Sequence, residues 1–356
     1  MVDSAVTTSK AGEQDAVDVV MRRCCDITGR VAGLGASAVR RQASSMLNEF
    51  WKNLGNRLRS GAQQCPFAST VMLAFLGRPM TLRYAIKTPP QHGRWEDYLD
   101  IWREADRIET FESAWNFDHF YPTSEPFDGP CLEGWTMLAA LAQATSRLRI
   151  GSMVSAVPYR HPAVIANMAA TVDVISGGRF VLGLGAGWHE IESAAYGLPL
   201  GTMRERMDRF EEGVEVVISL LTKNETSFNG EYYQLTNARC EPKGPQQPPP
   251  LVIGGVGKRR TLRIVARHAQ MWDSLFIPPS EWPALHQVLV EHCAAVGRDP
   301  SEITSVAHVK YTAGENANDL AEQAYAYGEA GVDLVVFSMI APLSAASLEP
   351  LAAALS

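Results

Sequence analysis

The adjacent pair Asp118-His119 is the part of this sequence best suited to acid–base chemistry. It directly follows a short apolar run, Ala114–Phe117, that predicts a buried strand. An imidazole titrates near neutral pH, and a neighbouring carboxylate can serve as an anchoring acceptor. A purely structural role is the alternative, in which Asp118 caps the next helix and His119 packs under a loop.

Two glycine-rich segments could bind a cofactor or an anion. In Gly183–Gly187, three alternate glycines leave backbone amides uncovered, although their spacing is not that of a dinucleotide-binding loop. The second segment, Leu251–Gly257, is followed by the basic residues Lys258–Arg260. Uncovered amides, a helix N-terminus and positive charge predict a phosphate site there. A glycine-eased turn with solvated basic side chains is the structural alternative.

Other familiar site patterns are missing from the sequence. The remaining histidines show neither HxH nor HExxH spacing, so we expect no metal site. The absence of a GxSxG elbow argues against hydrolysis by a Ser-His-Asp triad. The six cysteines have no CxxC spacing, which indicates free thiols in a reducing cytoplasm.

These candidate residues lie in a regular alternation of elements. From Met80 onward, short apolar strands alternate with amphipathic helices, one of which begins at Pro162 and stops at Gly177. Asn229-Gly230 predicts a hairpin with a two-residue turn. We expect eight further strands: Leu82–Lys87, Ala114–Phe117, Leu148–Val154, Phe180–Gly183, Leu251–Ile253, Met271–Phe276, Ile303–Val309 and Val332–Ser338.

This alternation within residues 80–356 predicts an α/β fold, a (β/α)8 TIM barrel with a hairpin insertion. A doubly wound sheet also alternates, but it usually has a Gly-rich turn after its first strand, where this chain has Lys87-Thr88-Pro89-Pro90. Chemistry in such barrels occurs at the C-terminal ends of the strands. We therefore expect Asp118-His119 and the glycine-rich segments at one end of the barrel.

Composition limits the class of protein. The chain has 356 residues, of which 46% are hydrophobic and 20% are charged, which is enough for a large buried core. The formal net charge of -7 argues against a nucleic-acid partner. No run of eighteen apolar residues occurs, so we expect a soluble, cytoplasmic protein with no membrane partner.

Residues 1–79 differ from the rest of the chain and are predicted to form an N-terminal extension. They carry ten Lys and Arg against six Asp and Glu, and one amphipathic stretch lies within residues 47–58. Two interpretations stay open: a helical or disordered extension, or translated upstream sequence with Met80 as the true start. In neither case do we expect the segment to be catalytic.

From Ile86 to the C-terminus, the sequence resembles the luciferase-like flavin and deazaflavin oxidoreductases, most closely their coenzyme F420-dependent branch. The resemblance covers about three quarters of the chain and leaves residues 1–79 outside. It rests on motifs in the family's order, namely WNFDHFYP at 115–122, VPYRHPAV at 157–164, SGGRFVLGLGAGW at 176–188 and LVIGGVG at 251–257.

The resemblance implies a deazaflavin or flavin ring at the C-terminal mouth of the barrel. Asp118 would fix the cofactor and the imidazole, and His119 would be the acid/base. Ser152 matches the place of a non-prolyl cis peptide bond behind the ring, and Ser155 matches a position that hydrogen-bonds the ring system. The other matched cofactor positions are Ala186 and Gly187 at the rim of the fourth strand, and Gly254, Gly255 and Gly257 in the phosphate loop.

The sequence departs from the family's sugar-phosphate dehydrogenases at two places. Those enzymes carry a Trp shortly after the Asp-His pair, where this chain has Thr123-Ser124, and a catalytic Glu at the position of Trp188. Glu190 or Glu192 could replace that Glu, and we take Glu190 as the candidate. Both could equally be carboxylates favoured by a helix N-terminus. Oxidation of a sugar phosphate is therefore not the expected reaction.

We expect hydride transfer between F420 and a small-molecule organic substrate, with His119 moving the matching proton. A monooxygenase that uses reduced FMN and oxygen is the alternative, because the scaffold is shared. A non-catalytic flavin-binding relative is the third interpretation. Two partners stay open: a second copy of the chain in a homodimer, and a separate reductase that supplies reduced cofactor. None of the motifs names the substrate.

Overall fold

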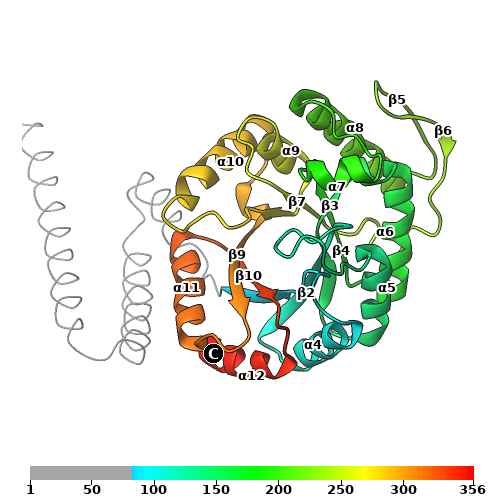
Figure 1. Cartoon of the computed structure of the whole chain (residues 1–356). Helices are drawn as coiled ribbons and strands as arrows, with labels where there is room; N and C mark the ends of the chain where they lie inside the picture. The colour runs from blue at the N-terminus through cyan, green and yellow to red at the C-terminus, as the bar shows by residue number, and fades with distance from the viewer. Residues whose placement is uncertain (1–81) are drawn as a thin grey trace, which may run out of the picture. The chain divides into compact units, whose positions relative to one another are not determined.

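The computed structural model of the chain describes residues 82–356 (Figure 1). The predictions for residues 1–79, including a true start at Met80, lie outside the described residues. Figure 1 views the barrel along its axis, with the helices forming an outer ring around the strands. The eight strands are parallel and close in the order β1-β10-β9-β8-β7-β4-β3-β2. This closed barrel confirms the predicted TIM-barrel fold.

Every predicted barrel strand is present near its expected position. The bounds differ by at most three residues: β2 begins at Phe111 instead of Ala114, β9 ends at Thr312 instead of Val309, and β8 ends at Asp273 instead of Phe276. Leu275 has a φ of 61°, which no strand residue adopts, and its backbone N–H donates to the Asp273 carboxylate at 2.8 Å. The barrel strands are β1 (Arg83–Lys87), β2 (Phe111–Asp118), β3 (Arg149–Ala156), β4 (Phe180–Gly185), β7 (Leu251–Gly254), β8 (Met271–Asp273), β9 (Thr304–Thr312) and β10 (Leu334–Ile340).

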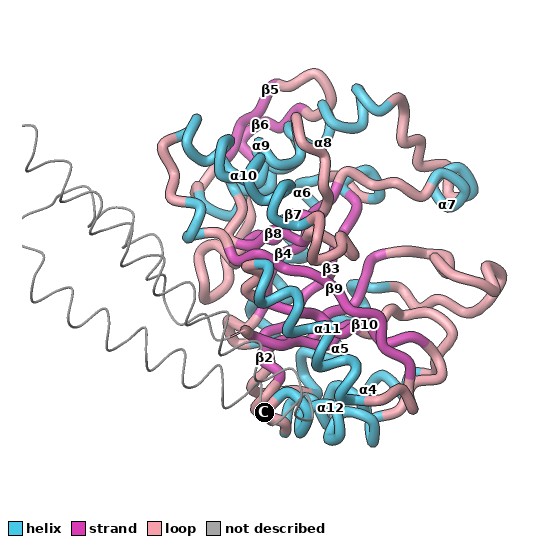
Figure 2. Tube along the Cα trace, turned by 90° about the vertical axis from the view of Figure 1, so that its left-hand side faces the viewer, coloured by secondary structure: helices cyan, strands magenta, loops and turns pink. Residues whose placement is uncertain are grey.

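The helices cover the outside of the strands, as Figure 2 shows from the side. Helix α6 begins at Pro162 and is capped by Gly177 with a φ of 66°, as these two residues predict. The terminal helix α12 was not predicted, because its sequence LEPLAAAL is short and apolar at most positions. The helices are α4 (Trp95–Arg107), α5 (Gly134–Ala144), α6 (Pro162–Ser176), α7 (Glu190–Ala195), α8 (Met203–Thr222), α9 (Thr261–His268), α10 (Trp282–Val296), α11 (Ala317–Ala330) and α12 (Leu348–Leu355).

The predicted hairpin insertion is present as β5 (Thr226–Asn229) and β6 (Gln234–Ala238). The predicted two-residue turn is wrong, because Asn229 pairs with Gln234 and four residues, 230–233, connect the strands. The carboxylate of Glu212 in α8 accepts hydrogen bonds from three successive backbone amides, those of residues 231, 232 and 233, at 2.8 to 3.2 Å. This anchoring stabilises a longer loop than the Asn-Gly signal alone predicts.

The two faces of the barrel strands enclose different layers. A large apolar core fills the space between strands and helices. Inside the barrel lies a smaller apolar layer consisting of Ala85, Trp115, Met153, Val181, Val252, Val306, Leu334 and Val336. Because side chains alternate along a strand, the next interior positions after Ala85, Val306 and Val336 are occupied by Lys87, His308 and Ser338. The interior thus becomes polar toward the C-terminal ends of the strands.

Candidate active site

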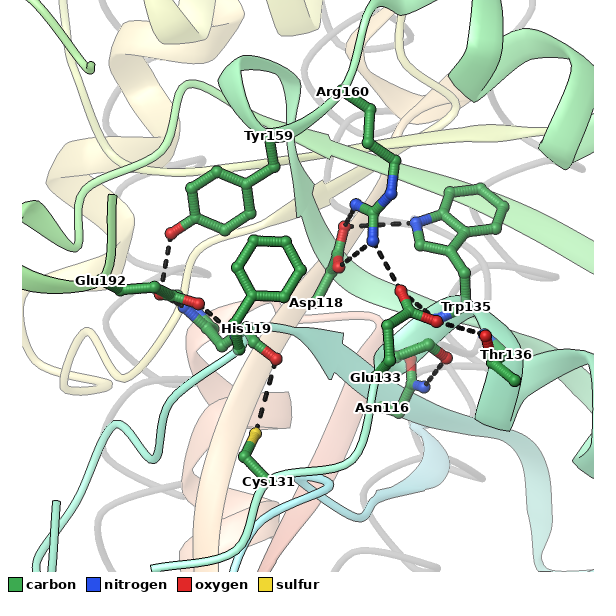
Figure 3. A network of polar contacts seen from close by, with 12 residues as sticks. Asn116, Asp118, His119, Cys131, Glu133, Trp135, Thr136, Tyr159, Arg160 and Glu192 are labelled. Carbon is green, nitrogen blue, oxygen red and sulfur yellow. Dashed lines mark hydrogen bonds and ion pairs between the residues drawn. The ribbon is translucent and has the colours of Figure 1, made fainter. Parts of the chain in front are cut away.

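Asp118 ends strand β2, and two neighbouring side chains hold its buried carboxylate (Figure 3). Arg160 donates to the two carboxylate oxygens at 2.6 and 3.0 Å, and the indole Nε1 of Trp135 donates to Oδ2 at 3.2 Å. The same guanidinium also donates to Glu133 at 2.6 Å, next to the N-terminus of α5. Contrary to expectation, Asp118 does not hold the imidazole of His119.

The imidazole of His119 is instead bound by Glu192, from helix α7 (Figure 3). Its Nδ1 lies 2.6 Å from Glu192 Oε2, which also accepts a hydrogen bond from the Tyr159 hydroxyl at 2.8 Å. The other carboxylate oxygen accepts from the backbone N–H of Phe120. Because an ionised carboxylate only accepts, Nδ1 carries the proton of the neutral ring. Nε2 is thereby left as the atom that can accept or return a proton.

The contacts around Glu192 keep it ionised although it is fully buried. Burial alone raises the pKa of this carboxyl, but hydrogen bonds from His119 and from the Phe120 amide outweigh burial and hold the pKa below its usual range. Burial, together with the nearby Glu192, raises the pKa of the Tyr159 hydroxyl, so this hydroxyl remains a donor. A fixed negative charge therefore lies against the imidazole.

The candidate carboxylate Glu190 lies outside this buried cluster. Its side chain is 83% exposed and is 3.7 Å from the guanidinium of Arg206. Of the two glutamates considered from the sequence, the structure brings Glu192 and not Glu190 to His119. Trp188 packs edge-on beside His119, with ring centroids 5.5 Å apart, and is 59% exposed.

The end of strand β3 lies beside Asp118. Ser155 is its register partner across the two strands, and both residues are buried. The non-prolyl cis peptide bond expected at Ser152 joins Met153 to Val154, one residue further along. The hydroxyls of Ser152 and Ser155 have no hydrogen-bond partner among the described residues. Of these two serines, Ser155 is the one that the strand register places next to Asp118.

The glycines of the GLGAG segment have a packing role that the sequence did not reveal. A Cβ on Gly183 would overlap the backbone oxygen of Ser152, and one on Gly185 would lie 2.7 Å from the side chain of Val154. Strand β3 therefore approaches β4 more closely than any other residue type would allow. Gly187 follows with a φ of 79°, and its carbonyl oxygen accepts from Arg206 at 3.2 Å. Ala186 and Gly187 do lie at the strand's C-terminal end, as expected.

The loop after β7 contains the expected Gly254, Gly255 and Gly257. Gly255 has a φ of 123°, and a Cβ on Gly257 would lie 2.6 Å from the hydroxyl of Thr261 at the start of α9. Both positions therefore require glycine. The backbone N–H of Gly255 donates to the carbonyl oxygen of Asp273 at 3.0 Å, so only the amides further along the loop stay uncovered.

The expected positive charge beside this loop is partly neutralised. Arg260 is held by two carboxylates of α8, those of Asp208 at 2.6 Å and Glu211 at 2.9 Å. Lys258 and Arg259 are exposed. A phosphate at this loop would therefore be bound by amides more than by Arg260.

A second buried polar cluster inside the barrel was missed from the sequence. His308 bonds Asp273 through Nε2 at 3.0 Å and Ser338 through Nδ1 at 2.9 Å. Lys87 donates to the carbonyl oxygen of Met153 at 2.7 Å. Burial lowers the pKa of both Lys87 and His308, and the nearby Asp273 carboxylate opposes the shift. The signal that could have found these residues is their position two residues beyond an interior apolar residue.

Two other kinds of feature are absent from residues 82–356. No group of three or more His, Cys, Asp or Glu is arranged to hold a metal ion in this range. None of its helices is both long enough and apolar enough to cross a membrane.

The residues around the barrel mouth fit a cofactor that has polar ring atoms and a phosphate. The Ser155 hydroxyl and Asp273 Oδ2 are buried and have no partner among the described residues, as expected for polar atoms that a ligand completes. In the loop after β7, the Gly255 N–H is taken by the Asp273 carbonyl oxygen, whereas the N–H groups of Val256 and Gly257 have no hydrogen-bond partner among the described residues and could bind an anion. The residues that could hold the group are Asp118, Ser155, Ala186, Gly187, Gly254, Gly255 and Gly257.

Comparisons with known proteins show what this chain is similar to. A family model described as luciferase-like monooxygenase matches residues 75–349. An F420-dependent glucose-6-phosphate dehydrogenase from Amycolatopsis mediterranei is 34% identical over 160 residues, which cover 44% of this chain and 46% of that protein. Pyrimidine monooxygenase RutA from Cronobacter turicensis is 36% identical over 126 residues, which cover 35% of this chain and 33% of that protein.

The fold is shared with a solved structure. An F420-dependent secondary alcohol dehydrogenase in complex with an F420-acetone adduct superposes with a TM-score of 0.71 at 18% identity, covering 78% of this chain and 100% of the other. The matched stretch spans half or less of the length of the two curated relatives. The family model, by contrast, covers more than half of this chain. The chain therefore belongs to the luciferase-like monooxygenase family, as its motifs predict.

Proposed function

We propose that this protein is an F420-dependent oxidoreductase that transfers a hydride between the deazaflavin cofactor and a small organic substrate. The observation that carries the proposal is the His119–Glu192 pair at 2.6 Å, which leaves the imidazole Nε2 available for a proton. The named F420-dependent dehydrogenase supports this choice of cofactor through its 34% identity over the matched stretch.

The chain's own residues then have separate tasks. The cofactor supplies the hydride donor or acceptor when it is bound. His119 gives or takes the matching proton at Nε2, and Glu192 stabilises the imidazolium that forms when the proton is taken up. Asp118, held by Arg160, and the hydroxyl of Ser155 bind polar atoms of the ring, and the glycine loop after β7 binds the phosphate.

Cofactor binding is the first test of this proposal. The full chain is titrated separately with F420 and with FMN, and binding is followed by quenching of cofactor fluorescence. We expect F420 to bind at least about tenfold more tightly than FMN, a difference of about 1.4 kcal/mol. Binding of neither cofactor by a folded chain would contradict the proposal.

Replacement of His119 tests the acid/base role. In His119→Ala we expect turnover to fall by about 10²–10⁴-fold, the usual loss when a positioned acid/base is removed. The dissociation constant for F420 should change little, because no cofactor contact is assigned to the imidazole. An unchanged turnover would remove His119 from the mechanism.

A monooxygenase that uses reduced FMN and oxygen is the second candidate. The family model and the pyrimidine monooxygenase that is 36% identical over 126 residues support it. Selective binding of FMN in the titration above, with oxygen consumption dependent on substrate, would favour this candidate. A separate reductase that supplies reduced cofactor would then be the expected partner, and a second copy of the chain is a further partner to test by molecular mass in solution.

A further inference from the structure

A pocket of about 300 Å³ lies between the loop after β3, helix α8 and the hairpin insertion. It is lined by Pro158, Arg160, His161, Arg209, Tyr232 and Tyr233. This set contains two arginines and no carboxylate. The volume lies at the lower end of ligand pockets, so it suits one group of a larger ligand better than a whole cofactor.

Arg209 supplies a cation with no carboxylate partner. Of the three arginines in α8, Arg204 lies 3.8 Å from Asp208, and Arg206 lies 3.7 Å from Glu190. Arg209 forms no ion pair within residues 82–356. Its guanidinium donates only to a backbone carbonyl, that of residue 199, at 3.2 Å and lies 5.2 Å from the ring centroid of Tyr232.

His161 presents a hydrogen-bond donor on the same pocket. It caps helix α6, with its Nδ1 accepting the backbone N–H of Ala163 at 3.2 Å. The proton of the neutral ring is therefore on Nε2. The ring lies edge-on to Tyr233, with centroids 5.3 Å apart.

Four neighbouring carboxylates already have donors of their own, while Glu231, next to Tyr232 in the chain, is exposed to solvent. Glu212 accepts the three amides of the hairpin loop, and Glu205 accepts the backbone N–H and hydroxyl of Thr202. Asp118 and Glu133 share the guanidinium of Arg160. The groups that line the pocket and remain to donate to a ligand are the guanidinium of Arg209, the imidazole N–H of His161 and the hydroxyls of Tyr232 and Tyr233.

The hairpin insertion completes this pocket. Glu212 anchors the four-residue loop, and this loop carries both Tyr232 and Tyr233 to the face of α8 that bears Arg209. Arg160 connects the pocket to the barrel mouth, because it lines the pocket while its guanidinium holds Asp118. The pocket and Asp118 are thus separated by one arginine side chain.

We propose that this pocket binds an acidic group, a carboxylate or a phosphate, of a molecule bound at the barrel mouth. This proposal rests on the proposed function, which supplies the molecule bound at the barrel mouth. The acidic group belongs either to the side chain of the cofactor or to the substrate. Arg209 provides the charge, and His161 and the two tyrosines provide further donors.

The test compares Arg209→Gln with Arg204→Gln in the full chain. Both variants remove one positive charge from α8, but the Arg204 side chain is 90% exposed and does not line the pocket. Each protein is titrated with F420, with the corresponding deazaflavin riboside that has no acidic group, and with inorganic phosphate and benzoate by calorimetry. Thermal unfolding checks that each variant is folded, and Arg209→Lys shows whether charge alone restores binding.

If the acidic group in the pocket belongs to the cofactor, Arg209→Gln should weaken F420 binding by about 10–100-fold, the range of a charge-assisted hydrogen bond. Binding of the riboside should then be unaffected. If the acidic group belongs to the substrate, F420 binding should be unchanged, and phosphate or benzoate binding should weaken by a similar factor. In both cases Arg204→Gln stays within about threefold of wild type, as expected for a screened surface charge. Equal losses in the two variants, or no loss with any probe, would overturn the proposal. If neither cofactor binds, the proposed function fails, while phosphate and benzoate still test the pocket.

Discussion

The carboxylate of Glu192 lies 2.6 Å from the imidazole Nδ1 of His119, although the two residues are 73 positions apart in the chain. This contact joins the end of strand β2 to helix α7. It fixes the orientation of the ring and directs proton exchange to Nε2. Activity should therefore depend on Glu192 even though this residue is proposed to contact neither cofactor nor substrate.

The first prediction concerns the two glutamates of α7. Glu192→Gln should lower kcat by about 10–100-fold, because a neutral amide stabilises the imidazolium less than a carboxylate does. Glu190→Gln should lower kcat by less than about threefold, because the Glu190 side chain is 83% exposed. Steady-state kinetics on both variants decides between them, and a larger loss in Glu190→Gln would restore Glu190 as the catalytic carboxylate.

The second prediction concerns stability at low pH. The folded-state pKa of Glu192 is below its ordinary value of about 4.3. Its stabilising contribution is therefore complete above that value and is lost as the pH falls through the lower folded-state pKa. Urea unfolding at pH 6 and pH 3 should show a smaller loss of unfolding free energy in Glu192→Gln than in the wild type. An equal loss in the two proteins would mean that Glu192 is not held ionised by its neighbours.

Helix geometry explains why the sequence could not choose between Glu190 and Glu192. Two helix residues that are two positions apart are rotated by about 200° around the helix axis, so the two carboxylates point to nearly opposite sides. The direction of α7 relative to β2 decides which one meets His119, and that direction depends on packing between distant segments. Asp118-His119 could be identified because the two residues are adjacent and end a strand whose apolar character is local.

The fold was predictable for the same reason, because strand and helix periodicities are local properties of the chain. The polar contacts of the site side chains were not predictable, because each contact joins strands or loops that are far apart in the sequence. Arg160 reaches Asp118 across 42 positions, and His308 reaches Asp273 across 35. The prediction of a two-residue turn at Asn229-Gly230 was wrong because Glu212, a residue outside the hairpin, binds the amides of a longer loop.

The third prediction concerns the Arg160 clamp, that is, the ion pair in which Arg160 holds the carboxylate of Asp118. Arg160→Met leaves the buried carboxylate of Asp118 without its cation, which should cost about 3–5 kcal/mol of unfolding free energy. Arg94→Met is the matched control, because Arg94 pairs with Asp97 at the surface and its replacement should lower the unfolding free energy far less. Denaturant unfolding at neutral pH measures both. Similar values for the two variants would show that the clamp contributes no more than a surface ion pair.

The fourth prediction concerns the close approach of β3 and β4. In Gly183→Ala, the new Cβ would overlap the backbone oxygen of Ser152, so one strand must move, at a cost of about 3 kcal/mol or more. Gly177→Ala is the control, because Gly177 has a φ of 66° but no atom within 4 Å of the new Cβ. Only backbone strain of about 1–2 kcal/mol opposes that change.

Urea unfolding of the two alanine variants separates steric overlap from backbone strain. If strand β3 must shift in Gly183→Ala, the shift also moves Ser155 and the Val154 side chain, which lies against Gly185. We therefore expect Gly183→Ala to weaken cofactor binding as well, while Gly177→Ala binds like the wild type. A Gly183→Ala protein as stable as Gly177→Ala would mean that β3 adjusts freely.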